Sequence, residues 1–210
     1  MKTQKIENII FDLGGVIIDL DMEHTFDRFS QLFGRDVRAK MMDDPQNHFF
    51  FHQFEIGAID EAEFRHALRN FTHTDLDDQR LDLAWNAMLG DIPKHRIEWI
   101  EALAAQYKVA ILSNTNSIHI RRFHEIFAQT TTYKHPNELF HNIYYSHEIS
   151  DRKPNASCYR KVLDDLGANP AKTIFLDDNH ANLKAAAALG MQTVLVERNL
   201  LRREQLPNGR

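Results

Sequence analysis

Residues 6–16 read IENIIFDLGGV, and this stretch decides the class of fold. Its first part is a short, mostly apolar run, which is typical of a strand that is covered on both faces. An aspartate and two glycines follow directly, where such a strand would end. Comparable runs return at 109–112, 173–176 and 191–196, with a weaker one at 143–145. We therefore predict that these runs form one parallel sheet.

Helix-like stretches separate the runs. They cover residues 94–106, 117–127, 155–166 and 180–189. The last of them contains an alanine run, which favours a helix, and Gly190 follows it as a natural C-cap. Strands that alternate with helices at this spacing indicate βαβ units. We predict an α/β fold with a doubly wound, Rossmann-like parallel sheet as its core.

The segment 20–91 interrupts this alternation. It contains no convincing strand, and amphipathic helical patterns occur at 61–71 and 76–89. Such a segment is far longer than a crossover between two strands needs. We therefore predict an inserted all-helical cap domain at 20–91 and an α/β core made of residues 1–19 and 92–210.

Composition excludes several classes of function. The 210 residues include 25 Lys and Arg against 30 Asp and Glu, a net charge of −5, which argues against nucleic-acid binding. The basic cluster at 198–203 reads as a solvated tail, and residues 128–142 read as a surface loop. The single cysteine, Cys158, lies in an amphipathic helical pattern, so we expect a packed free thiol and a reducing, cytoplasmic location. No apolar stretch approaches the roughly 20 residues of a membrane span, so no membrane contact is expected.

The residues that follow the predicted strands carry the chemistry, because ligands of an open parallel sheet bind beyond the carboxyl ends of its strands. In chain order these residues are Asp12, Ser113 with Asn114, Lys153, and Asp177 with Asp178. Separated carboxylates among oxygen-bearing neighbours suit a hard cation such as Mg²⁺. The sequence therefore predicts a magnesium site at one edge of the sheet.

The remaining groups at this edge suit a phosphate. The hydroxyl and the amide after the second strand donate hydrogen bonds, and Lys153 supplies a positive charge. Gly14 and Gly15 let the backbone approach a ligand closely and present its N–H groups. Because the metal and the lysine would offset the repulsion between two anions, Asp12 becomes a candidate nucleophile that forms an aspartyl-phosphate.

In this order along the chain, the motifs resemble those of the haloacid dehalogenase superfamily of hydrolases, including the helical cap inserted after the first motif. Residues 51–59, followed by Phe64, resemble the cap of bacterial sugar-phosphate phosphatases, and most of all the α-D-glucose-1-phosphate phosphatase type. The resemblance implies a Mg²⁺-dependent phosphatase whose partner is a small phosphorylated metabolite, with a sugar phosphate as the expected substrate. We expect a monomer or a weak homodimer.

The resemblance also implies a role for each site residue. Asp12 would be the nucleophile and a Mg²⁺ ligand, and the backbone carbonyl of Gly14 would be a second ligand. Asp178 would bind the metal directly, whereas Asp177 would act nearby, through water or by orienting Lys153. The catalytic residues would be Asp12, Lys153 and Ser113. The residues that contact the phosphate or substrate would be Gly14, Gly15, Ser113, Asn114, Lys153 and His52. Asn182 would make a supporting contact.

One position departs from the family pattern. Phosphatases of the family usually carry an aspartate two residues after the nucleophile, as general acid and base, and here that residue is Gly14. Three explanations stay open: a substrate with a good leaving group such as an anomeric oxygen, a substitute among Asp19, His24 and His52, or a catalytically weak or inactive protein with a binding or regulatory role.

The twelve histidines also raise the question of a zinc site. His48 and His52 are four residues apart, but a run of phenylalanines fills the interval, so an aromatic patch of the cap is the preferred interpretation. The pair His119 and His124 lacks ligand spacing and is expected to be solvated. The same holds for His135 and His141.

Overall fold

The strand formed by the opening stretch, β1 (Asn8–Phe11), lies in the middle of a parallel sheet. The structure is a computed structural model that describes residues 5–34, 36–38 and 45–201, with the backbone alone for 45–48. In the described part of the chain, the sheet has five strands in the order β3-β2-β1-β4-β5. The other strands are β2 (Lys108–Ser113), β3 (Asn142–Tyr145), β4 (Thr173–Asp177) and β5 (Gln192–Leu195).

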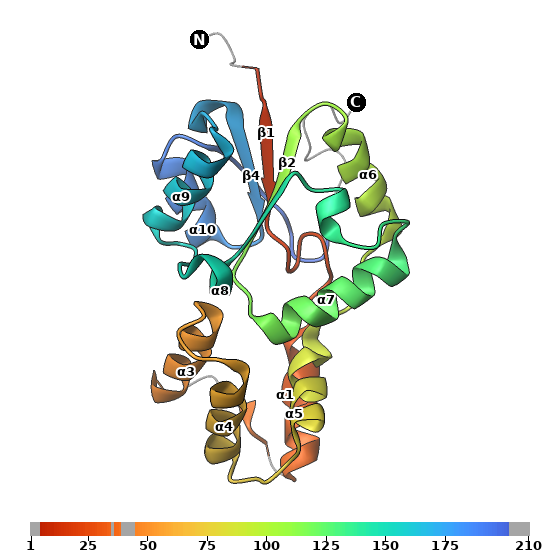
Figure 1. The fold of residues 1–210 in the computed structure, drawn as a ribbon, viewed down its shortest axis with the longest axis vertical. Helices are drawn as coiled ribbons and strands as arrows, with labels where there is room; N and C mark the ends of the chain where they lie inside the picture. Colours follow the sequence, from red (N-terminus) through yellow and green to blue (C-terminus); the bar gives the residue numbers. More distant parts are fainter. Residues whose placement is uncertain (1–4, 35, 39–44, 202–210) are drawn as a thin grey trace.

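Both faces of the sheet are covered by helices, as Figure 1 shows. Ile9 and Phe11 face the side of α6 (Lys94–Ala104) and α7 (Ser117–Thr130), and belong to the same buried cluster as the apolar residues of these helices. Ile10 faces the opposite side, where it joins the buried residues of α9 (Ala156–Leu166) and α10 (His180–Ala188). This alternation of side chains explains why the strand is almost entirely apolar. The predicted doubly wound α/β fold is confirmed.

A group of helices lies beyond one end of the sheet (Figure 1). Its elements are α1 (Met22–Phe33), α3 (Pro45–Glu55), α4 (Glu61–Thr72), α5 (Asp78–Trp85) and the 3₁₀ helix η1 (Asn86–Met88). They share an apolar cluster of their own, in which Phe29, Phe64 and Leu81 are fully buried. Helix α4 starts with a capping box between Asp60 and Glu63, which fixes where it begins.

The chain crosses between the sheet and these helices twice, and the two crossings lie side by side. The Asp19 N–H donates to the Asp91 carbonyl at 2.9 Å, and the Gly90 N–H donates to the Asp19 carbonyl at 2.9 Å. Leu20 and Leu89 form an isolated antiparallel bridge next to them. The predicted cap boundaries fall at this paired crossing, and the division into two domains stays a prediction.

Short elements complete the core. They are α8 (Ser146–Ile149) and the 3₁₀ helices η2 (Pro136–Glu138) and η3 (Pro170–Lys172). The expected surface loop at 128–142 is wrong in part, because α7 extends to Thr130 and both Leu139 and Phe140 are buried in the main core. Cys158 is completely buried on α9, as its pattern predicted.

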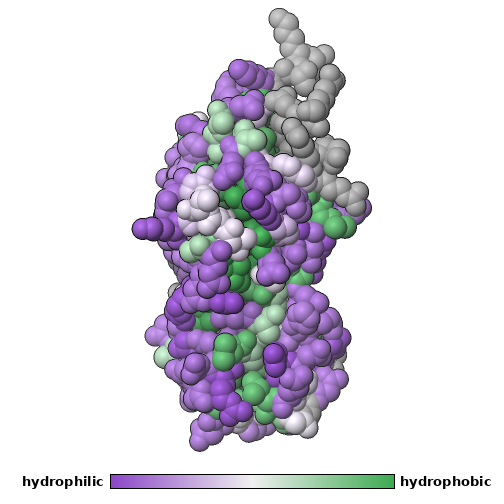
Figure 2. Space-filling view, turned by 90° about the vertical axis from the view of Figure 1, so that its right-hand side faces the viewer, coloured by the Kyte–Doolittle hydropathy of each residue, from purple (hydrophilic) through white to green (hydrophobic). Residues whose placement is uncertain are grey.

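The molecule is narrower between the sheet and the helical group than at either of them. Figure 2 shows hydrophobic residues at the surface of this narrow part. Among the described residues, no helix combines the length and the apolar character that a membrane crossing requires.

Candidate active site

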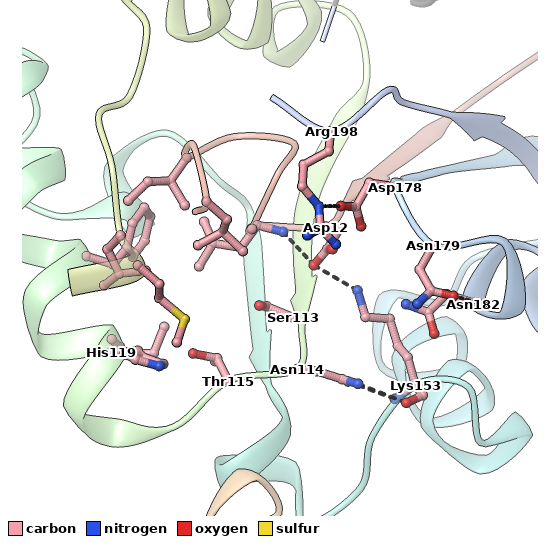
Figure 3. Close-up of a pocket in the computed structure, with 18 residues that line it drawn as sticks. Asp12, Ser113, Asn114, Thr115, His119, Lys153, Asp178, Asn179, Asn182 and Arg198 are labelled. Atoms are coloured by element: carbon pink, nitrogen blue, oxygen red, sulfur yellow. Dashed lines mark hydrogen bonds and ion pairs between the residues drawn. The ribbon is translucent and has the colours of Figure 1, made fainter. Parts of the chain in front are cut away.

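A buried lysine joins two carboxylates at the carboxyl ends of β1 and β4. The Lys153 Nζ lies 2.8 Å from Asp12 Oδ1 and 2.7 Å from Asp177 Oδ2. Lys153 is 1% exposed and Asp177 is not exposed at all, so both charges are removed from bulk water. Such charges are tolerated in an interior when they are paired and hydrogen-bonded. The fold therefore places the predicted nucleophile and the predicted phosphate-binding cation in direct contact (Figure 3).

Burial sets the protonation of this cluster. It raises the pKa of Asp12 to about 7, although the nearby Lys153 ammonium acts in the opposite direction. Burial alone would lower the pKa of Lys153, but the carboxylates of Asp12 and Asp177 outweigh it and raise that pKa above its usual value. Lys153 therefore stays positively charged, and cations near Asp12 favour its ionised form.

Asp177 is held from several sides. It accepts hydrogen bonds from the Asn179 N–H at 2.7 Å and from Asn182 Nδ2 at 3.0 Å, in addition to the lysine contact. Asn179 is also the N-cap of α10, so the start of that helix and the carboxylate are fixed together. Asp177 thus contacts both Lys153 and Asn182, and the roles expected of Asp177 and Asn182 stay predictions.

Asp178 faces the pocket instead. Its Oδ2 lies 2.7 Å from Arg198 Nε, on a segment that follows β5. Carboxylate oxygens of Asp12, Asp177 and Asp178 lie within 4.8 Å of one another. A Cβ on Gly15, whose φ is +74°, would lie 2.7 Å from Asp178 Oδ2, so glycine leaves room for this carboxylate. The donor set is oxygen-only and anionic, which fits Mg²⁺.

Asn114 is engaged with the backbone of Lys153. Its Nδ2 donates to the Lys153 carbonyl at 2.8 Å, and its Oδ1 accepts from the Lys153 N–H at 2.9 Å. This double contact fixes the start of the lysine side chain. Ser113 is 3% exposed and lines the pocket, one residue before Asn114.

The pocket is a cavity of about 220 Å³ with two unlike halves. Figure 3 shows the charged half, where Asp12, Lys153, Asp178 and Arg198 come together. The other half is mostly apolar and includes side chains from η1 and from the two segments that connect the sheet to the helical group. Its polar members are His119 and Thr115. The apolar lining residues of the whole pocket are Leu13, Ile18, Leu20, Met88, Leu89, Ile120 and Phe123.

One pocket residue, His119, contradicts the sequence interpretation, and another, Arg198, is exposed as expected but has a specific partner. His119 is 8% exposed rather than solvated, because it lies on the first turn of α7 and is covered by the helical group. Arg198 is not part of a detached tail, since its guanidinium reaches Asp178 across the pocket rim. Both follow a strand by a few residues, so the same strand-end rule that selected Asp12 could have found them. Residues 202 and 203 of the basic cluster lie outside the described residues.

The suggested substitutes for a general acid do not line this cavity. The carboxylate of Asp19 pairs with Arg96 at 2.7 Å, and His24 lies on the exposed side of α1. His52 lies at the end of α3, 2.7 Å from the Arg152 guanidinium. The side chain of His48 lies outside the described residues. Next to it, Phe50 and Phe51 pack partly against the helical cluster, which supports an aromatic patch.

Comparison with known proteins decides the family. The sequence pattern described as haloacid dehalogenase-like hydrolase matches residues 6–190. The chain belongs to the haloacid dehalogenase-like hydrolases. The predicted superfamily and the assignment as a hydrolase are therefore confirmed. Its likeness to the glucose-1-phosphate phosphatase type stays a prediction.

Among the relatives of this hydrolase are characterised proteins and solved structures of similar length. A D-ribitol-5-phosphate phosphatase from Bacteroides thetaiotaomicron is 27% identical over 205 residues, which cover 96% of this chain and 97% of the relative. A crystal structure of a haloacid dehalogenase family enzyme from the same organism superposes with a TM-score of 0.88 at 33% identity, over 93% of this chain and 95% of that one. The wild-type form in complex with magnesium and inorganic phosphate has a TM-score of 0.85 at 33% identity, over 92% and 95% of the two chains.

Proposed function

We propose that this hydrolase is a Mg²⁺-dependent phosphatase that acts on the phosphate ester of a small hydroxylated metabolite, such as a sugar or sugar-alcohol phosphate. The observation that carries the proposal is the contact of a pocket-lining carboxylate, Asp12, with the fully buried ammonium of Lys153. The magnesium and phosphate complex of a relative and the name of the ribitol-phosphate phosphatase support the same chemistry. A cytoplasmic location and a monomeric or weakly dimeric state stay predictions.

Different residues of the pocket would hold the metal and the phosphate. Asp12, the Gly14 carbonyl and Asp178 would hold Mg²⁺, and Asp177 would orient Lys153. When bound, the ion neutralises negative charge on the phosphoryl oxygens and the attacking carboxylate. Arg198 occupies one oxygen of Asp178 and would have to give way to the ion or share the carboxylate with it.

Hydrolysis proceeds in two displacements. A carboxylate oxygen of Asp12 attacks phosphorus in line while the bond to the leaving oxygen breaks, which gives an aspartyl-phosphate and the alcohol. Water then attacks the same phosphorus, the bond to Asp12 breaks, and inorganic phosphate leaves with the carboxylate restored. Lys153 and Ser113 hold the phosphoryl oxygens in both steps, and Asn114 fixes Lys153 through its backbone.

The departing oxygen lacks the usual proton donor at position 14. Leu20 fills that space, because a Cβ on Gly14 would lie 2.3 Å from its Cδ1. The proton would therefore come from water, which suits a leaving group of low basicity. This same feature favours the second candidate function, a protein that binds phosphate esters but hydrolyses them weakly.

The proposal is tested with a panel of phosphate esters assayed with Mg²⁺ and with a chelator. We expect phosphate release with Mg²⁺, and a fall to background when the chelator removes the ion, because the metal neutralises the charge that opposes attack. Phosphate release that survives chelation would contradict the proposal. Binding of esters without release would favour the second function.

Restoring an aspartate at position 14 separates the two functions further. The Gly14→Asp variant alone should lose about 1–3 kcal/mol of unfolding free energy, since Leu20 occupies the place of its side chain. Combined with Leu20→Ala, it should speed hydrolysis of alkyl phosphates about 10²-fold. Aryl phosphates, whose leaving groups need no proton, should gain much less. Denaturant titration and initial rates on both ester types provide the measurements, and equal gains on both would contradict the expectation.

A further inference from the structure

His119 is a buried ring that belongs to the apolar half of the pocket. Helix α7 begins next to it, and the Asn116 side chain that caps this helix accepts the His119 N–H at 3.0 Å. Figure 3 shows His119 and Thr115 next to one another, on the side of the pocket away from Lys153. The ring therefore lies where the alcohol part of an ester would extend when its phosphate occupies the charged half.

The helical group fixes the orientation of this ring. Its Nδ1 lies 2.8 Å from Asn86 Oδ1, at the start of η1, and its plane stacks on Trp85 with centroids 4.9 Å apart and 13° between the planes. An amide oxygen only accepts hydrogen bonds, so Nδ1 must carry the proton. The other nitrogen, Nε2, then holds a lone pair and acts as an acceptor.

Burial keeps the ring in this neutral form. It lowers the pKa of His119 to about 3, far below the pH at which most enzymes work. His119 therefore does not replace the proton donor that is missing at position 14. Its one proton, on Nδ1, is engaged with Asn86, and Nε2 carries none. Its remaining capacity is to receive a hydrogen bond.

The surroundings make that capacity selective. The pocket is lined largely by apolar side chains, Leu20, Met88 and Phe123 among them, and the Thr115 hydroxyl is the polar group seen beside the ring in Figure 3. We propose that His119 Nε2 accepts a hydrogen bond from a hydroxyl group of the departing alcohol and so selects phosphate esters of hydroxylated alcohols. The inference rests on the proposed phosphatase function and names the residue that determines its substrate class. A site built to bond a hydroxyl discriminates strongly against the analogue that lacks it.

Two variants separate the role of Nε2 from that of Nδ1, the nitrogen that contacts Asn86. His119→Asn keeps an amide donor for Asn86 but removes the acceptor at the Nε2 position. His119→Gln returns an amide oxygen near that position on a longer side chain. Both are compared with the parent on ribitol 5-phosphate and pentyl phosphate, which share five carbons and differ in their hydroxyl groups.

We expect the parent to have a higher kcat/KM for ribitol 5-phosphate than for pentyl phosphate. The ratio of these two kcat/KM values should fall about tenfold or more in His119→Asn. The loss should arise mainly in KM, and His119→Gln should recover part of the ratio. A ratio within twofold of the parent in His119→Asn would overturn the role of His119 while leaving the phosphatase function intact. Failure of the parent to hydrolyse any ester of the panel with Mg²⁺ would overturn both.

A spectroscopic measurement does not depend on the variants. In the protein labelled with ¹⁵N on histidine, the His119 ring should show a protonated Nδ1 and an unprotonated Nε2 from pH 5 to pH 8. Its Nε2 resonance should shift when ribitol 5-phosphate is added without magnesium. A proton on Nε2, or no shift at a ligand concentration that saturates the pocket, would overturn the proposal.

Discussion

Replacing Asp12 by asparagine is expected to abolish phosphate release, with kcat reduced on the order of 10³-fold or more. The side chain keeps its shape but loses the negative oxygen that attacks phosphorus. Its hydrogen-bond partners remain, because the Leu13 N–H and Lys153 Nζ both donate to Asp12 Oδ1, and an amide oxygen accepts from them as well. Steady-state rates on the most active ester of the panel, in saturating Mg²⁺, measure the loss.

A matched control is available in Asp19. Like Asp12, this aspartate lies between β1 and α1. It pairs with Arg96, however, and does not line the cavity. Asp19→Asn should keep kcat within about fivefold of the parent, because Asp19 does not line the cavity in which the ester would bind. Rates that persist unchanged in Asp12→Asn would exclude the aspartyl-phosphate route. A loss in Asp19→Asn as large as that in Asp12→Asn would reinstate Asp19 as the missing acid.

Replacing Lys153 by methionine should be the most destabilising change at the site. Methionine nearly matches the length of the lysine stem, so the change removes a charge more than a volume. Asp12 and Asp177 would then face each other in the interior without their shared cation. Breaking a buried ion pair in this way costs about 3–5 kcal/mol of unfolding free energy.

The loss should grow with pH. Lys153 lowers the pKa of Asp12, so its removal lifts that pKa further above the value of the unfolded chain. A carboxyl whose folded pKa is raised stabilises the fold when protonated and loses this contribution as pH rises through the folded pKa. The variant should therefore be closest to the parent near pH 5 and weakest at pH 8.

Urea titrations at the two pH values, with chelator present, measure both effects. Lys184→Met is the matched control, because Lys184 is exposed on α10, and it should change the unfolding free energy by less than about 1 kcal/mol. A deficit in Lys153→Met that is small, or equal at pH 5 and pH 8, would show that the buried pair does not act as described.

The fold was predictable because the three central strands of the sheet, β2, β1 and β4, are almost entirely buried. The run 109–112 is apolar at every position, and a serine and an asparagine follow it, so such strands and their order along the chain were visible in the sequence. The candidate site followed from one rule, that residues after parallel strands share one edge. This rule brought Asp12, Ser113, Lys153 and Asp178 into one pocket.

The rest depended on contacts between distant segments. The role of His119 is set by Asn86 and Trp85, which belong to another part of the chain and have no periodic relation to it. Arg198 reaches the pocket because Asn199 bonds to Leu20, with Leu20 N–H donating to Asn199 Oδ1 at 2.8 Å. Residue type likewise identified Asn114 as polar, but only the three-dimensional arrangement shows that its amide is committed to the Lys153 backbone.

The central place of β1 has a consequence for biosynthesis. One of the two partners of this strand, β4, lies 165 residues further along the chain, so β1 leaves the ribosome well before it. At ordinary elongation speeds, about 10–30 s pass between the synthesis of β1 and that of β4, and during this time β4 cannot cover the apolar side chains of β1. The helical group is complete long before then. Asp12 is thus made well before Lys153 and Asp177, and the buried charge cluster that the three residues share forms only after Asp177 has emerged.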